Sequence, residues 1–388
     1  MSWRDRYRIV RELVPVGTVE RHAVVDGDGV GALVLTAPRA VARVTEALID
    51  EVAALHQAAR GPGVPGVRET GWTAEHAFVV YDCGACIDLE ELAATAHVLQ
   101  ATVSYRLGTA LVRMLMTTLE RVHAITHGGR PICLGLLGTQ TVMFDASGVL
   151  WLIGFGGFPV SLRAHEGRVY QAPEVAAGAP PTPGADLYAV TLLVRSLIGT
   201  VEMPASALRV LQGDALPEDQ PLVDLLLVAN LQILAGYPHR RPSMAEGLAM
   251  SRKVWAHFGI EPDETGYRAW VARIVATATA RAQTVLTIEG GTVRLPGGER
   301  LDLSRHTAAR RLLVALAQDH VRGKGDGLDL AELVAAGWPG EAMSFASGAN
   351  RVHVALTKLR KLGLRELLVR DGGGYRLAPG IEVRLKSA

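Results

Sequence analysis

The sequence predicts an α+β protein with two domains: residues 1–252, then a helical connector over 253–284, then residues 285–388. The chain of 388 residues is longer than one ordinary core requires, and its 49% hydrophobic residues are ample for burial. A β-rich start gives way to long helical segments, and a second β-rich stretch begins at Val285. This restart of the pattern is the main reason to divide the chain.

Runs rich in Val, Ile and Tyr predict strands at residues 7–14, 19–25 and 30–36, with a turn at the DGDG segment. A shorter strand is expected at 77–81, which completes a β-rich part of about residues 1–80. Between these strands, apolar residues at spacings of 4, 4 and 3 predict one face of a helix: Val44, Leu48, Val52 and Leu55.

Long Ala-, Leu- and Val-rich segments predict helices from Leu89 to about Arg281, within a helical part of about residues 85–252. Two interruptions break this run. Residues 141–158 indicate a pair of short strands around a turn, and GAPPTPGA at 178–185 is typical of a loop.

The N-terminus has no apolar run of the kind found in signal peptides, and the longest apolar runs are too short to span a bilayer. We therefore expect a cytoplasmic protein without a membrane partner. The chain has three cysteines, which fits a reducing compartment. Cys83 and Cys86 form a C-x-x-C, but zinc needs further ligands and the remaining cysteine is Cys133. We interpret all three as small buried residues.

Seven short motifs follow one another along residues 1–252. They are YRIVRELVPVG (Tyr7–Gly17), FVVYDCGACIDLEEL (Phe78–Leu92), the helical run Thr118–His127, VMFDASGVLWLIGFG (Val142–Gly156), Ala172-Pro173-Glu174, GADLYAVTLLVRSLI with Asp186, and HRRPS (His239–Ser243). In this order they resemble the bacterial Ser/Thr protein kinases. The resemblance implies a bilobal fold with a hinge near Phe78–Leu92.

The residues that perform phosphoryl transfer in that family are missing. Kinases use a strand lysine, a catalytic Asp, and a magnesium-binding Asn and Asp. The resemblance puts Val34, Leu136, Thr141 and Gly154 at these positions, and no lysine precedes Lys253. It therefore implies a pseudokinase, which is not an enzyme and has neither a catalytic metal nor a cofactor.

Other features of the family are partly kept. The glycine-rich loop retains Gly17, and Glu51 is expected on the inward edge of its helix, where it has no lysine to pair with. A nucleotide would enter an apolar cleft with its charge uncompensated. Glu174 and Arg241 match a structural ion pair of the family, so we expect them to pair.

Charge is distributed unevenly between the two domains. Residues 285–388 contain 16 Lys and Arg against 11 Asp and Glu, a net of +5, which leaves −4 for residues 1–284 because the whole chain is +1. A basic tail on an acidic body favours nucleic acid as a partner of the tail.

The motifs of the last domain are W-P-G at Trp338–Gly340, N-R-V-H-V at Asn350–Val354, L-T-K-L-R-K-L-G-L at Leu356–Leu364, and the hairpin-like LLVRDGGGYRL at Leu367–Leu377. They resemble the winged-helix domain of OmpR-type and SARP-type regulators. The resemblance implies a strand-rich start, three helices and a C-terminal hairpin, or wing, that together bind DNA.

One helix of this domain is expected to enter the major groove. Val352, Leu356, Leu359 and the Leu362-Gly363 pair recur on one face and are expected to pack inward. The remaining side chains then face out and, with two wing arginines, are the predicted DNA contacts: Arg351, Val354, Thr357, Lys358, Lys361, Arg370 and Arg376.

Two functions follow from these patterns. The first is a transcriptional regulator, in which the pseudokinase senses a signal or docks a protein partner and residues 285–388 bind DNA, as a homodimer or in tandem. The alternative is a signalling scaffold that binds no DNA and contacts a genuine kinase or other proteins through both domains.

Overall fold

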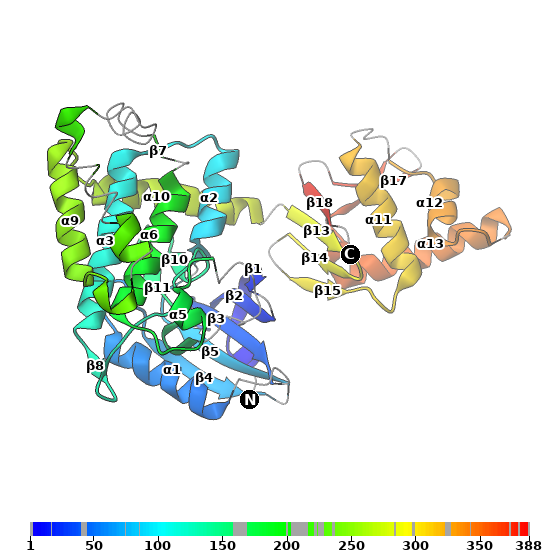
Figure 1. The fold of residues 1–388 in the computed structure, drawn as a ribbon. Coiled ribbons are helices and arrows are strands. Elements are labelled where there is room, and N and C mark those ends of the chain that lie inside the picture. Colours follow the sequence, from blue (N-terminus) through cyan, green and yellow to red (C-terminus); the bar gives the residue numbers. More distant parts are fainter. Residues whose placement is uncertain are drawn as a thin grey trace. The chain divides into compact units, whose positions relative to one another are not determined.

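The fold was obtained as a computed structural model and mixes α-helices and β-strands (Figure 1), which agrees with the predicted class at that level. The structure describes residues 3–16, 18–39, 45–73, 75–84, 86–157, 169–198, 201–202, 216–220, 223, 229–234, 237–282, 285–296, 299–322, 327–341, 343–371, 374–378 and 381–386. Gly17 and Val44, both named above, lie outside these ranges.

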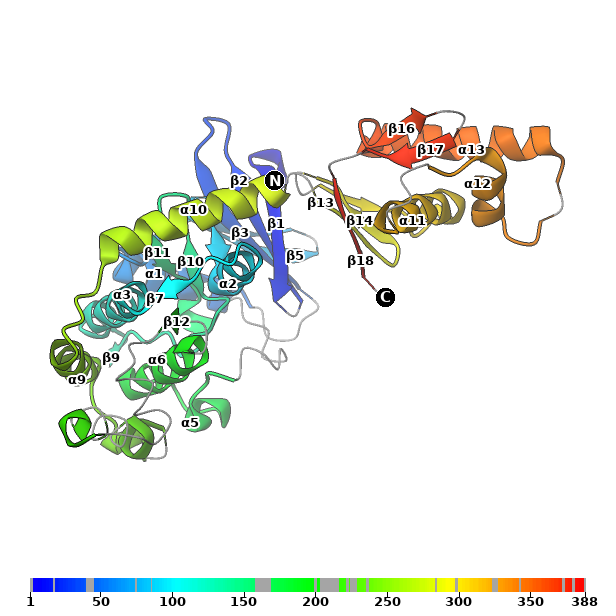
Figure 2. The same cartoon turned by 90° about the horizontal axis from the view of Figure 1, so that it is seen from above.

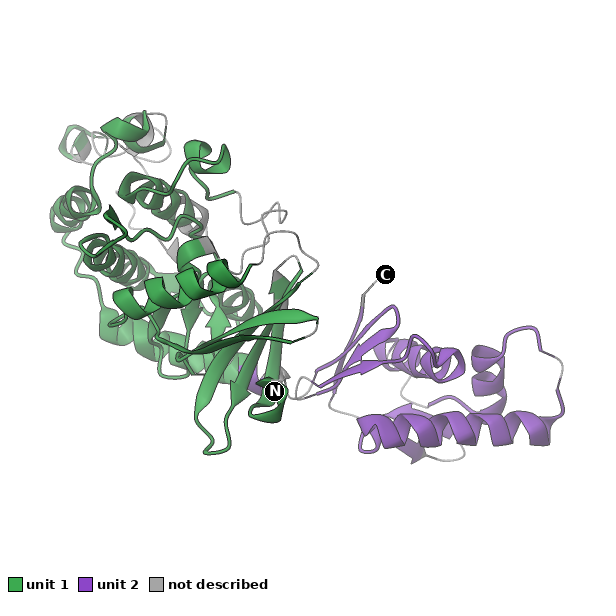
Figure 3. Ribbon diagram, turned by 90° about the horizontal axis from the view of Figure 1, so that it is seen from below, with its two compact units in different colours: residues 1–278 green, residues 279–388 purple. Residues whose placement is uncertain are grey.

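The chain forms two compact units, residues 1–278 and 279–388 (Figure 3). The sequence predicted a connector over 253–284, but most of that segment belongs to unit 1. The helices α9 (Met244–His257) and α10 (Glu264–Ala282) place Trp255, Tyr267 and Trp270 in the main hydrophobic core of this unit. The burial of these aromatic side chains explains why the boundary falls some 25 residues later than predicted.

Unit 1 begins with a short helix, η1 (Trp3–Asp5), and a five-stranded antiparallel sheet in the order β1-β2-β3-β5-β4. The strands are β1 (Arg8–Val16), β2 (Val19–Val25), β3 (Gly31–Pro38), β4 (Val67–Trp72) and β5 (His76–Tyr81). The four predicted strands are confirmed. The fifth, β4, was not predicted, because its sequence VRETGW has no apolar alternation and its side chains are only half-buried.

The helix α1 (Glu46–Ala59) covers one face of this sheet. Its N-cap is Thr45, whose hydroxyl accepts a hydrogen bond from the Leu48 amide at 3.2 Å. Ile49 and Val52 of α1 pack against Leu33 and other inward-facing residues of the strands. The opposite face of the sheet has its own small core with Trp3, Tyr7, Val34 and Phe78.

A larger helical region follows, with β10 (Val142–Phe144) and β11 (Leu150–Leu152) forming a small sheet with β6 (Ile87–Asp88). Its helices are α2 (Leu89–Val98), α3 (Tyr105–His123), α5 (Pro173–Ala176), α6 (Pro183–Ile198), α9 and α10. Figure 2 shows α10 lying along this region, and the rings of Tyr267 on α10 and Phe144 on β10 are 6.2 Å apart.

Short elements complete unit 1. They are the strand pairs β7 (Val103–Ser104) with β12 (Val201–Glu202) and β8 (Thr126–His127) with β9 (Arg130–Pro131), and the short helices η2 (Phe155–Gly157), η3 (Pro217–Asp219), η4 (Ala229–Leu234) and η5 (Pro238–Arg240).

Unit 2 has the predicted order of strands, three helices and a hairpin. Its sheet has the order β15-β14-β13-β18, and β16 pairs with β17 in the hairpin. The elements are β13 (Val285–Glu289), β14 (Thr292–Arg294), β15 (Arg300–Asp302), α11 (Thr307–Val321), α12 (Leu330–Gly337), α13 (Phe345–Leu359), η6 (Arg360–Leu364), β16 (Leu368–Asp371), β17 (Gly374–Leu377) and β18 (Glu382–Lys386).

The last strand, β18, was not predicted. It pairs in parallel with β13, with Val285 opposite Glu382 and Glu289 opposite Lys386, so the end of the chain closes the sheet that begins the unit. None of the helices in the described part of the chain is long and apolar enough to cross a membrane.

Candidate functional sites

The loop Leu134–Thr141 of unit 1 is held by a buried aspartate. Asp186 on α6 accepts hydrogen bonds from the amides of Leu134 (2.8 Å) and Gly135 (2.7 Å). His123, at the end of α3, donates from Nε2 to the same carboxylate at 2.9 Å. Sequence reasoning placed Asp186 on its helix but did not find its three donors, because they are 51 to 63 residues away along the chain.

Three of the predicted degenerate positions, two in this loop and one after β11, carry no charged side chain. Leu136 is half-buried and apolar, and Gly154 adopts a positive φ of 97°. Thr141 is buried, and its hydroxyl accepts from the Gly138 amide at 3.0 Å and contacts the Gly138 carbonyl at 3.1 Å. Its polar group is therefore used within the loop itself. A metal would find no carboxylate at any of these three positions.

Two of the predicted positions, one in the first sheet and one on α1, need correction. Val34 was matched to the strand lysine, but its side chain lies on the sheet face away from α1. Because side chains alternate along a strand, Leu33 and Leu35 face α1 instead. Glu51 was expected on the inward edge of α1, but it is exposed, since the inward positions of that helix are Ile49 and Val52.

A buried ion pair joins the first sheet to the helical region. Arg21 on β2 has a side chain only 2% exposed and donates from Nη2 to Asp88 Oδ2 at 2.6 Å, while the Asp88 side chain is 4% exposed. A second nitrogen of Arg21, Nη1, donates to the Gln140 carbonyl at 3.4 Å. Asp88 also caps α2, because its Oδ1 accepts from the Glu91 amide at 2.7 Å.

A second ion pair lies beside the first. Arg11 on β1 is buried and pairs with Glu91 on α2. Burial raises the pKa of Glu91, and the positive charge of Arg11 opposes that rise. We call the four residues Arg11, Arg21, Asp88 and Glu91 the arginine clasp.

The arginine clasp changes the expected chemistry of this region. The sequence predicted an apolar cleft between the β-rich and helical parts, but two buried guanidinium groups reach across from β1 and β2 to the start of α2. Both are neutralised by carboxylates of the same chain. A buried charge is tolerated when it is paired in this way.

The predicted ion pair between Glu174 and Arg241 is present. Arg241 donates from both terminal nitrogens to the two carboxylate oxygens of Glu174, and its Nη2–Oε2 distance is 3.1 Å. The Arg241 guanidinium also lies 4.9 Å from the ring centroid of Tyr188. A bidentate pair with a buried arginine is the strong geometry for such a contact.

One group of side chains in the described residues has the composition of a metal site: His123, Cys133 and Asp186. The carboxylate of Asp186 already accepts hydrogen bonds from two amides and the histidine. Burial, with the nearby Asp186, raises the pKa of the Cys133 thiol, so the thiol stays protonated. The arrangement fits a structural hydrogen-bond network better than a metal centre.

Cys83 and Cys86 are buried and unbridged. The Cys86 thiol donates to the Cys83 carbonyl at 2.7 Å, and burial raises its pKa well above the usual value. Both residues pack in the core beside the first sheet, which is the role expected for them.

In unit 2, α13 separates apolar and basic side chains onto two faces. The helix starts at Ser344, whose hydroxyl accepts from the Ser347 amide. Its apolar face is buried in the core of the unit through Val352, Ala355, Leu356 and Leu359. The outward positions of α13 and of η6, which follows it directly, are all exposed, as predicted: Arg351, Val354, Thr357 and Lys358 on α13, and Lys361 on η6. Leu362 is half-buried, and Gly363 is exposed with a positive φ of 106°.

Two of the predicted contacts on α13 already have polar partners. Arg351 donates to Glu341 at 2.7 Å, and its guanidinium lies 5.9 Å from the ring centroid of Trp338. Lys358 Nζ donates to His306 Nδ1 at 3.1 Å.

The wing hairpin is tied to α13. The hydroxyl of Tyr375 on β17 and His353 Nδ1 on α13 form a hydrogen bond at 3.1 Å. Arg370 on β16 is exposed and lies opposite Tyr375 in the strand register, whereas Arg376 is half-buried. The structure thus brings α13 and the wing together, and Arg376 contributes less exposed charge than predicted.

No protein-family model matches this chain, and no curated protein matches it either.

Proposed function

We propose that the protein is a transcriptional regulator, in which unit 2 is a winged-helix domain that binds DNA and unit 1 is a pseudokinase that receives a signal or docks a protein partner. The protein would act in the cytoplasm, where it can contact both DNA and signalling kinases. DNA binding would use α13 in the major groove and the β16–β17 wing on the adjacent backbone or groove.

The observation that carries DNA binding is the two-faced α13. This helix buries one apolar row and exposes Lys358 on the other face, and η6 directly after it exposes Lys361. A helix of this kind can enter a major groove about 12 Å wide. Val354 is 63% exposed among these charges, and an apolar side chain on such a face suits the methyl group of thymine.

The pseudokinase half of the proposal rests on element order and on missing charge. An antiparallel sheet with one helix precedes a helical region in the order that the sequence motifs suggest, and Leu136, Thr141 and Gly154 supply no base and no magnesium ligand. The arginine clasp adds support, since its two buried arginines, on β1 and β2, are already paired with carboxylates of the helical part.

DNA binding is tested by fluorescence anisotropy of the full chain with a pool of labelled genomic fragments over a salt series. The logarithm of the binding constant should fall linearly with the logarithm of salt concentration. Lys358→Ala and Lys361→Ala should each reduce this slope by about 1. The matched control is Arg384→Ala on β18, an exposed cation off the proposed interface. No measurable binding at low salt refutes the regulator.

Loss of catalysis is tested by a thermal-shift titration with ATP, with and without magnesium. If the chain is a pseudokinase, its Tm should show no magnesium-dependent rise with ATP. A specific rise that needs magnesium, or phosphate transfer to any acceptor, would contradict the pseudokinase assignment.

A second candidate function is a signalling scaffold in which unit 2 contacts protein rather than DNA. Two observations favour it. Arg351 is paired with Glu341, and Phe345 at the start of α13 is 69% exposed. Aromatic residues and arginine are typical of protein interfaces. In the anisotropy assay the scaffold predicts no salt-dependent DNA binding.

A further inference from the structure

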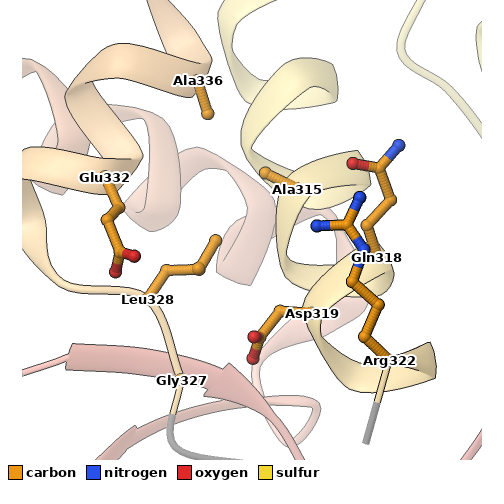
Figure 4. Close-up of a pocket in the computed structure, with 8 residues that line it drawn as sticks. All are labelled: Ala315, Gln318, Asp319, Arg322, Gly327, Leu328, Glu332 and Ala336. Carbon is orange, nitrogen blue, oxygen red and sulfur yellow. The ribbon is translucent and has the colours of Figure 1, made fainter. Parts of the chain in front are cut away.

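A polar pocket opens in unit 2 between α11 and α12. Neither of these helices carries a proposed DNA contact. The volume of the pocket is about 370 Å³, and Figure 4 shows the residues around it: Ala315, Gln318, Asp319, Arg322, Gly327, Leu328, Glu332 and Ala336. The size lies within the range of small-molecule sites.

Asp319 is the central feature of this pocket. The residue is only 8% exposed, and no hydrogen bond or ion pair to its carboxylate occurs in the described part of the chain. Figure 4 shows this carboxylate directed toward the space in front of Leu328. A carboxylate on a residue of such low exposure, with no partner among the described residues, suits a cationic ligand that enters the pocket.

Glu332 faces the same space from α12 (Figure 4). Its Oε2 accepts from the Asp329 amide at 2.9 Å as part of a capping box, which fixes the side chain at the start of the helix. The other carboxylate oxygen is left for a ligand. Glu332 therefore supplies a second acceptor whose position is set by the helix terminus.

The lining determines what kind of cation fits. Two carboxylates and the Arg322 guanidinium give the pocket a formal charge of −1, which suits a monovalent ligand. Ala315, Leu328 and Ala336 provide an apolar wall. A divalent metal would require more oxygen ligands than the Asp319 carboxylate and one oxygen of Glu332 provide.

We propose that this pocket binds a small organic monocation, an amine or a guanidine on a short apolar stem. The charged group pairs with Asp319 and reaches the free oxygen of Glu332, and the stem lies against Leu328 and the two alanines. A guanidinium suits the site best, because its planar fork can donate two parallel hydrogen bonds to one carboxylate. This site is independent of whether α13 binds DNA.

The test is isothermal titration of the full chain with butylguanidine and butylamine as probes, and with butanol as an uncharged control of similar size. The cations should bind and butanol should not. Asp319→Asn keeps the shape of the side chain and should weaken binding at least about tenfold, since it removes a charge-assisted hydrogen bond. Glu366→Gln, which removes an exposed charge from the same unit, should leave binding unchanged.

A second measurement separates loss of the site from loss of folding. Without ligand, Asp319→Asn should unfold at the same temperature as the native chain or higher, because it removes a charge that has no partner in the described part of the chain. N-acetyl-arginine amide tests whether an arginine of another protein can supply the same group. If the ligand is a free small molecule, this compound should bind more weakly than butylguanidine.

Three binding results would overturn the proposal. They are equal binding of butanol and butylguanidine, an unchanged affinity in Asp319→Asn, and tighter binding of the peptide-like arginine than of the free guanidine. A marked loss of stability in ligand-free Asp319→Asn would also count against it, since the carboxylate would then have an internal partner.

Discussion

Replacing Arg21 with methionine is expected to destabilise unit 1 by about 3–5 kcal/mol, because it leaves the Asp88 carboxylate buried without its guanidinium partner. The magnitude follows from the burial of both side chains, 2% and 4% exposed, at an Nη2–Oδ2 distance of 2.6 Å. Two unit charges about 4 Å apart at an effective dielectric constant near 20 interact by about 4 kcal/mol, which falls in the same range.

A double-mutant cycle isolates the pair. Asp88→Asn removes the charge but keeps an N-cap for α2, since asparagine caps helices as well as aspartate does. The variant Arg21→Met with Asp88→Asn removes both buried charges at once. It should therefore be more stable than the sum of the two single effects predicts, by about 1–3 kcal/mol.

Hydrogen exchange measured by mass spectrometry is the suitable assay, because a chain with two compact units need not unfold in one step. Peptides from β2 and from the start of α2 should lose protection in each single variant and regain part of it in the double variant. Peptides from α11 belong to the other unit and should not change. Additive single effects, or loss of protection in α11 as well, would refute the argument for the arginine clasp.

Three further predictions concern single side chains. Burial lowers the pKa of His56 from 6.5 to about 4, so between these pH values the unfolded chain binds a proton that the folded chain does not. The free energy of unfolding should therefore fall by about 3 kcal/mol from pH 7 to pH 4. Urea unfolding should show a weaker pH dependence in His56→Phe. Glu174→Gln leaves the buried Arg241 without its charge partner and should cost about 3–5 kcal/mol in the same unfolding assay, whereas an unchanged midpoint would show that the pair contributes little. Leu356→Ala should cost about 2–5 kcal/mol in thermal unfolding of unit 2, while Val354→Ala should stay within about 0.5 kcal/mol yet weaken DNA binding in the anisotropy assay.

Most of the secondary structure followed from local patterns. Four strands of the first sheet, the faces of α13, and the strand–helix–hairpin order of unit 2 were all predicted, because alternation and helical spacing report burial directly. The two missed strands have weak patterns. β4 is half-buried throughout, and β18 is a short edge strand whose parallel partner, β13, is almost a hundred residues earlier.

The residues of the candidate sites also divide into those that the sequence predicted correctly and those that it did not. The exposed positions of α13 were predictable from its periodicity, and the Glu174–Arg241 pair from its motifs. Val34 and Glu51 were assigned to the wrong faces. For a strand, a one-residue error of register moves a side chain to the other side of the sheet, and no sequence motif here fixed that register.

The sequence by itself determined which residue types are absent from long stretches of the chain and where basic side chains gather. No lysine precedes Lys253, the three positions matched to catalytic and metal-binding residues are Leu136, Thr141 and Gly154, and residues 285–388 carry a net charge of +5. These are properties of composition and order, so they hold in any fold.

Only the tertiary structure decided which charges meet. Arg21 and Asp88 are 67 residues apart, and nothing local to either one indicates the other. Asp319 looks like an ordinary polar residue in a helix until the packing of α11 against α12 leaves it nearly buried beside a pocket. Burial and pairing of a charge depend on the segments that the fold brings together, because the cost of a charge is set by its surroundings rather than by its neighbours in the chain.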